Sequence, residues 1–414
     1  MAENKLQHCS FCGSHKDEVN KLIVGSDVAI CNECVDLCNK LIIEEQQDTE
    51  SVLSGEAKKN FDAYEIMNHL NARVIGQHDA KKVLSVAIAN HYKRINNPPK
   101  DSDLEISKGN VLLIGPTGSG KTLLARSVAK YLNVPFVVAD ATSLTEAGYV
   151  GDDVESMVST LLTMANGDVS LAERGIVFID EVDKISRKSE SSSITRDVSG
   201  EGVQQALLKL VEGTVCRVPT SGKRKNPNGE MVEVNTKNIL FIAGGAFGGL
   251  TDIIKHRVQG SALGFGAQVK SKKSNNDIKL TTPDDLTKFG MIPEFIGRFT
   301  TTIALEELTL SELVLILTDV KSNFIDQYQY LFSIDGIKLN FTKNAIEQIA
   351  ENCLLMKTGA RGLHSEVERV LMPHMFHSYQ YKKEGITEIN IDVDLVMEPK
   401  SLIDTQQQDS KNKE

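Results

Sequence analysis

Short hydrophobic runs alternate with segments of helical periodicity through the middle of the chain. The runs are rich in Val, Ile, Leu and Phe, which suits strands that are buried on both faces. We expect strands over residues 111–114, 135–139, 175–179 and 239–243. Apolar residues recur at helical spacing over residues 79–96, 121–132, 152–165 and 201–211. The alternation predicts an α/β domain with a parallel sheet that is covered by helices on both faces.

The pattern changes at about residue 310. Residues 309–312, Thr-Leu-Ser-Glu, form a capping box that is expected to open a long helix. Residues 338–341 predict a short strand, and Thr342 is expected to cap the helix that follows it. Apolar residues alternate over 389–393, as in a half-buried strand. The C-terminal part is therefore expected to be a second, smaller α+β domain.

The composition is that of an ordinary globular protein. Of 414 residues, 41% are hydrophobic and 25% are charged, which excludes a wholly disordered chain. The formal net charge is −10, so a long basic surface for nucleic acid is not expected. No apolar stretch approaches the roughly 18 residues of a membrane helix, and the first residues do not form an export leader. We therefore expect a soluble, cytoplasmic protein without a membrane or nucleic-acid partner.

Five of the seven cysteines fall within the first 38 residues. Cys9-x-x-Cys12 and Cys31-x-x-Cys34 are 18 residues apart, which matches the spacing of a structural four-cysteine zinc site. Four thiolates leave no open position on the metal, so docking or dimerisation suits the site better than catalysis. The alternative is a set of reduced cysteines packed without metal. Three neighbouring side chains are expected not to bind the ion: Cys38, His8 and His15.

Residues 115–122, Gly-Pro-Thr-Gly-Ser-Gly-Lys-Thr, form a complete G-x-x-x-x-G-K-[ST] motif between a predicted strand and a predicted helix. The glycines allow backbone N–H groups to approach phosphates, Lys121 reaches the β- and γ-phosphates, and the Thr122 hydroxyl binds Mg²⁺. The nucleotide-binding residues predicted here are Gly115, Pro116, Thr117, Gly118, Ser119, Gly120, Lys121, Thr122 and Leu123.

Two carboxylates stand at the end of the predicted strand over 175–179. The strand would deliver Asp180 to the magnesium ion, and Glu181 could orient and deprotonate an attacking water. A GTP-dependent switch protein usually lacks the second acid, so ATP hydrolysis is the better interpretation. Without the phosphate loop, two acids at a solvated strand end would be an equally good interpretation.

The zinc motif, the phosphate loop with its preceding strand, and Gly148-Tyr149-Val150-Gly151 together resemble the ClpX family. The resemblance runs over residues 7–400. Members of this family are AAA+ ATP-dependent unfoldases that feed proteins to the ClpP peptidase. The resemblance implies a homohexamer with ATP sites between subunits. It also implies tagged or unfolded protein substrates and adaptors as partners.

The same resemblance also assigns substrate-binding residues, which the pattern of residues alone would not identify. Tyr149 and Val150 match the loop that grips the substrate chain in the central pore. Arg196 lies in a segment similar to the second pore loop. Arg224 and Lys225 match a basic loop at the pore entrance, where the usual Arg-Lys-His is Arg-Lys-Asn in this chain. The lost imidazole leaves the exact tag preference open.

A hydrophobic tripeptide in a Gly/Ser/Lys-rich segment is similar to the family's peptidase-docking motif. Leu263-Gly264-Phe265 stands where the family carries an Ile-Gly-Phe-type sequence that docks into ClpP. Leucine has the volume and apolar character of isoleucine, so docking is expected to survive. A hydrophobic tripeptide among lysines also suits a partner site better than a core segment.

Four further residues are assigned to the nucleotide by the resemblance. Arg298 matches the arginine finger that a subunit supplies to its neighbour's γ-phosphate, and Arg361 matches sensor 2 of the small domain. Val74 and Ile75 match the segment that packs around adenine. No residue is assigned to sensor 1.

The expected division of the chain is a zinc-binding domain (1–50), a linker (51–64), a large AAA+ ATPase domain (65–309), a small AAA+ domain (310–400) and a disordered tail (401–414). We identify no protease constellation, so proteolysis must come from a partner. Three alternatives are disfavoured. The acidic net charge opposes a nucleic-acid motor, and intact Lys121, Asp180 and Glu181 oppose an adaptor with a degenerate site. The zinc motif and the Leu-Gly-Phe segment oppose an HslU-like unfoldase.

Overall fold

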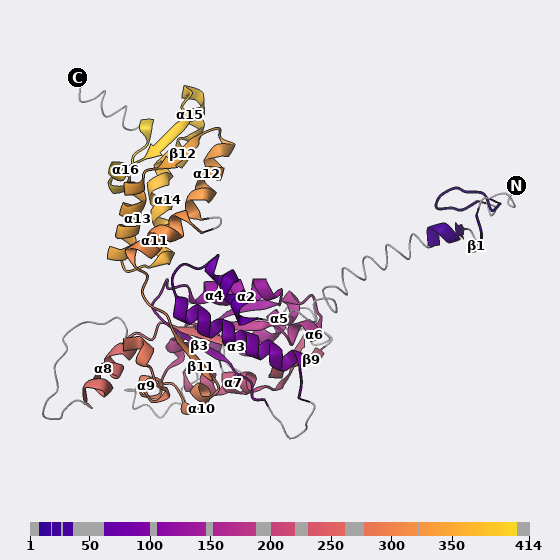
Figure 1. The fold of residues 1–414 in the computed structure, drawn as a ribbon, viewed down its shortest axis with the longest axis horizontal. Helices are drawn as coiled ribbons and strands as arrows, with labels where there is room; N and C mark the ends of the chain where they lie inside the picture. The colour runs from indigo at the N-terminus through magenta and orange to yellow at the C-terminus, as the bar shows by residue number, and fades with distance from the viewer. Residues whose placement is uncertain are drawn as a thin grey trace. The chain divides into compact units, whose positions relative to one another are not determined.

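The computed structural model describes residues 8–17, 19–25, 28–35, 62–99, 106–145, 152–187, 200–219, 231–260, 277–320 and 323–403. The chain divides into two compact units, Met1–Asn60 and Phe61–Glu414 (Figure 1). None of the described helices is long and apolar enough to cross a membrane.

The N-terminal unit is built around its cysteines. Strands β1 (Leu22–Val24) and β2 (Ala29–Cys31) pair in an antiparallel hairpin. Cys9, Cys31 and Cys34 are buried, and among the described residues of this unit Val19, Leu22 and Ile30 pack against them. A unit of this length rarely stabilises a fold by apolar packing alone and usually needs a metal or another cross-link.

A five-stranded parallel sheet forms the centre of the second unit. The order across the sheet is β11-β3-β10-β7-β4, and every neighbouring pair is parallel. The strands are β3 (Val111–Ile114), β4 (Phe136–Asp140), β7 (Ile176–Asp180), β10 (Leu240–Gly245) and β11 (Thr301–Ala304). Parallel strands end at the same edge, so the sheet brings the end of β3 and the end of β7 to one side.

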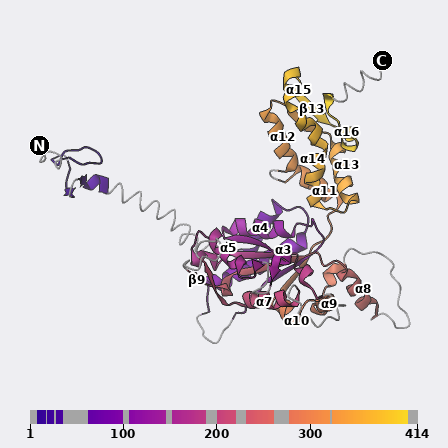
Figure 2. The ribbon, with the colours of Figure 1, turned by 180° about the vertical axis from the view of Figure 1, so that it is seen from behind.

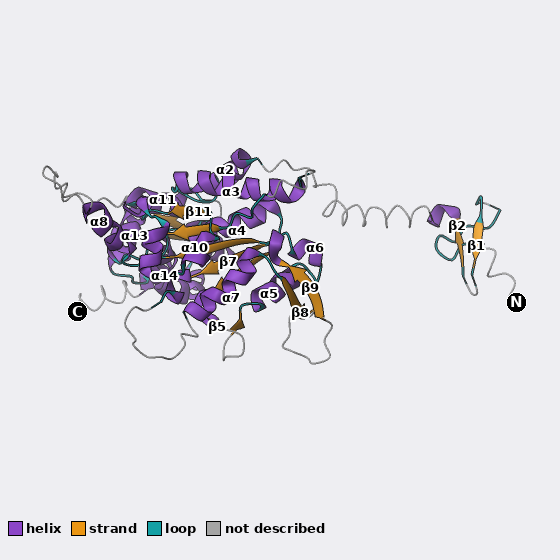
Figure 3. Ribbon diagram, turned by 90° about the horizontal axis from the view of Figure 1, so that it is seen from below, coloured by secondary structure: helices purple, strands orange, loops and turns teal. Residues whose placement is uncertain are grey.

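Helices cover both faces of this sheet, as the alternating pattern predicts (Figure 3). Leu113 and Phe178 face the cluster formed with α2 (Ala63–Asn71), α3 (His78–Asn96) and α4 (Lys121–Leu132). The neighbouring strand residues face the opposite cluster, to which α5 (Ser156–Met164), α7 (Glu201–Glu212) and α10 (Pro293–Gly297) contribute. The strands are therefore buried on both sides.

Shorter elements complete this part of the unit. β5 (Leu144–Thr145) pairs with β6 (Asp152–Asp153), and β8 (Val215–Pro219) pairs with β9 (Met231–Asn235). The remaining helices are η3 (Ala141–Ser143), α6 (Val169–Ala172), η4 (Val182–Ile185), η5 (Thr236–Asn238), α8 (Leu250–Gly260), η6 (Asp277–Leu280) and α9 (Pro283–Phe289).

The C-terminal part has a core of its own, which helices and one small parallel sheet share (Figure 2). Its strands β12 (Lys338–Phe341) and β13 (Glu388–Ile391) pair in parallel. The helices are α11 (Leu310–Thr318), α12 (Phe324–Ile334), α13 (Lys343–Leu355), α14 (Ala360–Phe376), α15 (Ser378–Glu384) and α16 (Val393–Met397). The expected α+β character is confirmed, and the predicted capping box at Thr309 and Glu312 is present.

Three expected elements differ from the structure. The helix expected from residue 152 begins at Ser156, because Asp152 and Asp153 pair as β6. The helix after the capping box is short and ends at Thr318. Val393 begins α16 instead of ending β13, because the Asp392 side chain accepts a hydrogen bond from Leu395 N and caps a helix there. The expected linker (51–64) is too long, because Ala63 and Tyr64 already belong to α2; its residues 51–61 lie outside the described residues. The expected disordered tail (401–414) begins too early, because Ser401 and Ile403 are buried; its residues 404–414 lie outside the described residues.

Candidate nucleotide site and metal centre

The phosphate loop connects the end of β3 to the start of α4. Gly118 and Gly120 have φ angles of +78° and +96°, a conformation that side chains rarely adopt. A Cβ on Gly118 would also lie 2.6 Å from the carbonyl oxygen of Thr358. Glycine at this position is therefore needed both for the turn and for the close approach of the C-terminal part.

The Lys121 side chain is buried against the phosphate loop. Its Nζ donates hydrogen bonds to the carbonyl oxygens of Gly115 (2.6 Å) and Pro116 (2.9 Å). Burial lowers the pKa of the Lys121 amine, and the negative charges of Asp180 and Asp183 oppose this shift. An amine held among carbonyl groups without a full counter-charge is ready to bind phosphate oxygens.

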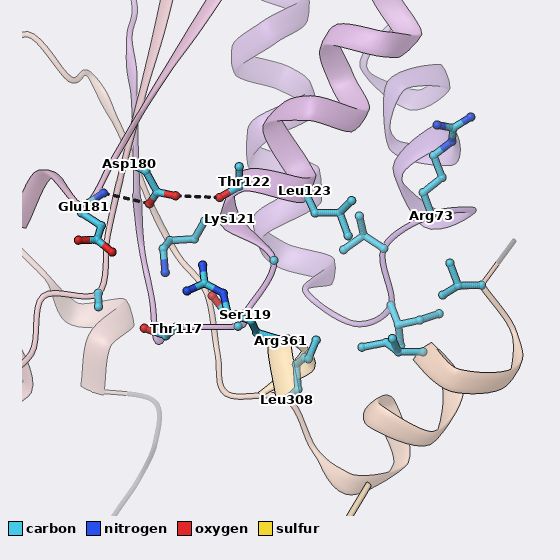
Figure 4. A pocket seen from close by; sticks show the side chains of 18 of the residues that line it. Arg73, Thr117, Ser119, Lys121, Thr122, Leu123, Asp180, Glu181, Leu308 and Arg361 are labelled. Carbon is cyan, nitrogen blue, oxygen red and sulfur yellow. Dashed lines mark hydrogen bonds between the residues drawn. The ribbon is translucent and has the colours of Figure 1, made fainter. Parts of the chain in front are cut away.

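Thr122 and Asp180 meet at the edge of the sheet. The Thr122 hydroxyl donates a hydrogen bond to Asp180 Oδ2 (3.0 Å), and Glu181 N donates one to Asp180 Oδ1 (2.9 Å) (Figure 4). Magnesium prefers oxygen ligands and usually binds through one or two carboxylates or hydroxyls together with substrate phosphates. Beside the phosphate loop, this hydroxyl and this carboxylate fit a magnesium site.

A pocket of about 570 Å³ extends from the phosphate loop into an apolar end. Its polar end contains the phosphate loop, Asp180, Glu181 and Arg361. Its apolar end is lined by Val74, Ile75, Leu123, Leu308, Ile316, Val320 and Phe324. A charged end joined to an apolar end suits a nucleotide, with phosphates at the loop and the base among the aliphatic side chains.

The C-terminal part contacts the phosphate loop directly. Ala360 N donates a hydrogen bond to Gly118 O (3.3 Å) at the start of α14. Arg361 follows and lines the pocket, where its positive charge acts on Lys121. The structure therefore brings Arg361 to the same pocket as Lys121 and Asp180.

Arg298 does not line this pocket. It follows α10 directly, is about half exposed, and forms an ion pair with Glu212 at the end of α7. A charged guanidinium at the surface can serve a partner. Arg298 therefore lies outside this chain's own pocket, and its role at a neighbouring subunit stays a prediction.

The sequence did not reveal several pocket residues. Arg73 precedes Val74 and Ile75, the segment predicted to pack around adenine. Asp183 is buried, and its Oδ1 accepts a hydrogen bond from Ala246 N (3.1 Å). Asp183 could have been noticed as a third acid near the end of the strand. Leu308 and Phe324 could not be recognised as pocket residues from the sequence, because any aliphatic or aromatic side chain could line the apolar end of the pocket.

The four predicted zinc ligands gather in one cluster. The sulfurs of Cys9, Cys12, Cys31 and Cys34 all lie within 4.8 Å of one another, and Cys12 Sγ lies 3.7 Å from Cys31 Sγ. Zn–S bonds of about 2.3 Å in a tetrahedron place sulfurs about 3.8 Å apart, so the cluster fits zinc. Gly13 has the positive φ of +82° that this tight turn needs.

The residues predicted to contact substrate and peptidase lie outside the described residues. These are Tyr149, Val150, Arg196, Arg224, Lys225, Leu263, Gly264 and Phe265. Their roles stay predictions.

Three family models match consecutive parts of the chain. Residues 7–44 match the ClpX C4-type zinc finger, residues 106–302 match the AAA domain (Cdc48 subfamily), and residues 308–388 match the C-terminal, D2-small domain of ClpB protein. A curated protein of Treponema denticola, the ATP-dependent Clp protease ATP-binding subunit ClpX, is 50% identical over 389 residues. The match covers 92% of this chain and 93% of that protein.

The chain belongs to the ClpX family. This membership confirms the predicted fold, which combines a zinc finger, an AAA+ domain and a small C-terminal domain. As a ClpX family member, the chain is an AAA+ ATPase that drives protein unfolding. Its cofactors are ATP, Mg²⁺ and Zn²⁺. None of the three matching models describes a protease domain.

Proposed function

We propose that this chain is the ATP-dependent unfoldase subunit of a bacterial cytoplasmic protease and passes unfolded chains to a ClpP-type peptidase. The observation that supports this most is the site where Thr122, Asp180 and Lys121 meet beside a pocket of nucleotide size. The relative that matches nearly the whole chain carries the name of such a subunit.

Within the pocket we assign each polar side chain one task. Lys121 binds the β- and γ-phosphates, and Thr122 with Asp180 would hold the magnesium ion. Glu181 takes the proton from the attacking water. Its backbone φ of +55° turns the chain at the end of β7, so that Glu181 and Asp180 line the pocket together. Arg361 contacts the phosphates from the C-terminal part.

We propose that the active form is a homohexamer. The exposed Arg298 would complete a neighbour's pocket, and an arginine finger contributes about 10³–10⁵ in rate in related phosphoryl-transfer enzymes. The ion pair of Arg298 with Glu212 would then hold the guanidinium in place until it binds a neighbour's phosphate.

Substrate handling is proposed for the loops outside the described residues. Tyr149 and Val150 would press on the chain in the pore, and Arg196, Arg224 and Lys225 would contact it in the pore and at its entrance. Leu263, Gly264 and Phe265 would dock on the peptidase, and the zinc domain would bind adaptors. The net charge of −10 supports protein substrates and no nucleic acid. The division into five parts given above is also part of this proposal, with the linker ending before Ala63, where α2 begins, and the tail beginning after Ile403.

The catalytic assignment is tested by Glu181→Gln. We expect this variant to bind ATP with normal affinity and to hydrolyse it at least about 100-fold more slowly, since general-base catalysis contributes about 10²–10⁴ in rate. The measurements are ATP binding by equilibrium dialysis and steady-state ATPase activity. Glu347→Gln, which removes an exposed acid on α13, is the matched control. Near-normal turnover by Glu181→Gln would refute the assigned role.

A further inference from the structure

Two residues of the turn between α2 and α3 line the apolar end of the nucleotide pocket. The turn runs from residue 72 to residue 77, and Val74 and Ile75 are its apolar pocket residues. The base of the bound nucleotide is proposed to lie among such side chains. A turn has no ladder of backbone hydrogen bonds, so its position depends on the partners that neighbouring elements offer to its polar groups.

Lys81 holds this turn from the start of α3. Its side chain is only 1% exposed, and its Nζ donates hydrogen bonds to Val74 O (2.6 Å) and to Asn71 Oδ1 (2.9 Å), at the end of α2. Lys81 is not among the residues that line the pocket. Any influence of Lys81 on a bound nucleotide therefore passes through Val74 and the turn.

The Lys81 ammonium is buried without an ion pair in the described part of the chain. Both of its hydrogen-bond partners are neutral oxygens. Burial lowers the pKa of Lys81, and the negative charge of Glu312 in the first turn of α11 opposes this shift. A methionine would fill the same space without the desolvation cost of a charge. The cost of burying the amine indicates that its hydrogen bonds have a use beyond packing.

The bond from Lys81 orients the peptide group that joins Val74 to Ile75. The Val74 N–H already donates to Leu70 O (2.8 Å), so Lys81 fixes the second backbone polar group of Val74. In a planar trans peptide the C=O and the next N–H point in opposite directions. The Ile75 N–H therefore points away from Lys81, and this bond sets the direction in which the chain enters Ile75.

The next anchor of the turn lies beyond Ile75. In the part of the chain that the structure describes, the backbone of Ile75 and of Gly76 makes no hydrogen bond. The Gln77 side chain then pairs with the backbone of Glu306, with Nε2 donating to the carbonyl oxygen (2.8 Å) and Oε1 accepting from the N–H (3.1 Å). Without Lys81, no described hydrogen bond would hold the chain between the Val74 N–H and Gln77.

We propose that Lys81 is a positioning residue for the base of the bound nucleotide. Its ammonium holds the Val74 carbonyl, so that Val74 and Ile75 form a fixed apolar wall and binding of the base does not have to order the turn. Lys121 and the phosphate loop lie at the polar end of the pocket, so Lys81 should act on the base and leave phosphate binding unchanged. This inference rests on the proposed placement of the base at the apolar end.

The test compares Lys81→Met with wild type in steady-state ATP hydrolysis by the full chain. Inhibition constants are measured for a non-hydrolysable ATP analogue and for tripolyphosphate, which has three phosphates but no base. We expect Lys81→Met to raise the KM for ATP and the inhibition constant of the analogue by about tenfold or more, because a charged hydrogen bond is lost. The inhibition constant of tripolyphosphate and kcat should stay within about twofold. Lys82→Met removes the exposed neighbouring amine and is the matched control, which should change no value by more than about twofold.

Asn71 gives a second way to disturb the same amine. Asn71→Ala removes one acceptor of Lys81 at an exposed position and should raise the KM for ATP by about threefold. Asn71→Asp keeps an acceptor oxygen and should leave the KM close to that of wild type. Neither variant empties a buried site, so the proposal can be decided even if Lys81→Met fails to fold.

Each outcome decides the proposal. An unchanged KM in Lys81→Met and in Asn71→Ala would overturn it. A fall in kcat at constant KM would overturn it as well, because a purely structural defect reduces only the amount of active protein. Equal losses for the analogue and tripolyphosphate would mean that Lys81 supports the whole pocket and does not position the base. If wild type binds the analogue no more tightly than tripolyphosphate, the proposed placement of the base fails, and this inference fails with it.

Discussion

Asp180 and Glu181 are neighbours in sequence but have different environments. The Asp180 carboxylate accepts hydrogen bonds from Thr122 and from Glu181 N, so its orientation is fixed. Glu181 has a left-handed backbone, which costs a non-glycine residue of order 1 kcal/mol. Strain of this kind persists where the surroundings hold the residue in place. Here it separates the proposed metal ligand from the proposed general base.

A buried carboxylate in the C-terminal part makes stability depend on pH. Glu366 accepts two hydrogen bonds from Arg369 (2.7 and 2.9 Å) and one from Asn352 (2.7 Å). The bonds from Arg369 hold the pKa of Glu366 below its usual range, although burial opposes the shift. A lowered pKa in the folded state stabilises the protein above the unfolded-state pKa of about 4.3. That stabilisation is lost as the pH falls through the folded-state pKa.

We therefore expect Glu366→Gln to lower the free energy of unfolding by about 1–2 kcal/mol at pH 7, allowing for the partly exposed Arg369. The difference from wild type should narrow as the pH falls below the unfolded-state pKa of about 4.3 and through the lower folded-state pKa. Urea denaturation followed by circular dichroism measures both values. Glu368→Gln, on the same helix, is the control and should change stability less. A difference that stays constant from pH 7 to about pH 3 would contradict the assigned ion pair.

At the residue scale, the sequence predicted those parts of the site in which binding a phosphate or a metal ion requires particular residues at fixed spacing. A backbone that wraps a phosphate needs glycines at fixed positions before Lys121 and Thr122, and a zinc ion needs paired cysteines. The apolar wall of the pocket has no such requirement. Leu308 and Phe324 reach it only through the packing of the C-terminal part. Their positions could not be predicted from one sequence.

At the scale of elements, predictions succeeded where turn or cap residues mark the ends. The bounds predicted for β3, α4 and β12 are those observed. The edge strand β11 (Thr301–Ala304) was missed, because its two threonines and partly exposed residues give a weak strand pattern. Only its pairing with β3 makes it a strand. The short β5–β6 pair was missed because strands of two residues carry too little pattern.

The turn between α2 and α3 joins the nucleotide pocket to the start of α11. Gly76 has a φ of +66°, and a Cβ there would clash with Glu312 Oε1. Glu312 cannot move away easily, because its Oε2 accepts hydrogen bonds from Thr309 N (2.8 Å) and Thr309 Oγ1 (2.9 Å) in the capping box. Gly76 directly follows Ile75, which lines the pocket.

We expect Gly76→Ala to weaken ATP binding by about tenfold or more, because the strained turn must displace Ile75 or break the capping box. Gly336→Ala is the matched control. Gly336 also has a positive φ, of +79°, but nothing lies within 4 Å of its added Cβ. That variant should lose some stability and keep its affinity. ATP affinity by equilibrium dialysis compares the two, and equal affinities would contradict the coupling of this turn to the pocket.

At the scale of the whole molecule, the zinc unit and the ATPase unit depend on different interactions. The N-terminal unit ends at Asn60, and its described residues place three apolar side chains, those of Val19, Leu22 and Ile30, around the cysteines. Structural zinc supplies about 10–16 kcal/mol of apparent binding free energy in small zinc fingers. The second unit, Phe61–Glu414, contains the three large apolar clusters. Loss of zinc should therefore unfold only the first unit.

We expect chelation of zinc to expose the amides of residues 8–35 to hydrogen exchange while basal ATPase activity stays within about twofold, since the clusters of the second unit bury enough apolar surface to fold alone. Cys31→Ala should lose zinc in the same way. Cys38→Ala should keep it, because Cys38 is predicted not to bind the ion. Zinc content and hydrogen–deuterium exchange report on the unit. Loss of ATP hydrolysis on chelation would mean that the two units are not independent.

The most direct measurement follows the unfolding of a stable fluorescent protein that bears a ClpX-type C-terminal tag, with ATP and a ClpP-type peptidase present. Wild type and Tyr149→Ala are compared, and ATPase activity is recorded for both. The account predicts that both proteins hydrolyse ATP and that only wild type abolishes the fluorescence, because the aromatic side chain must press on the chain. Equal loss of fluorescence with both proteins, or none with wild type despite robust hydrolysis, would contradict the central claim that ATP hydrolysis drives unfolding through Tyr149.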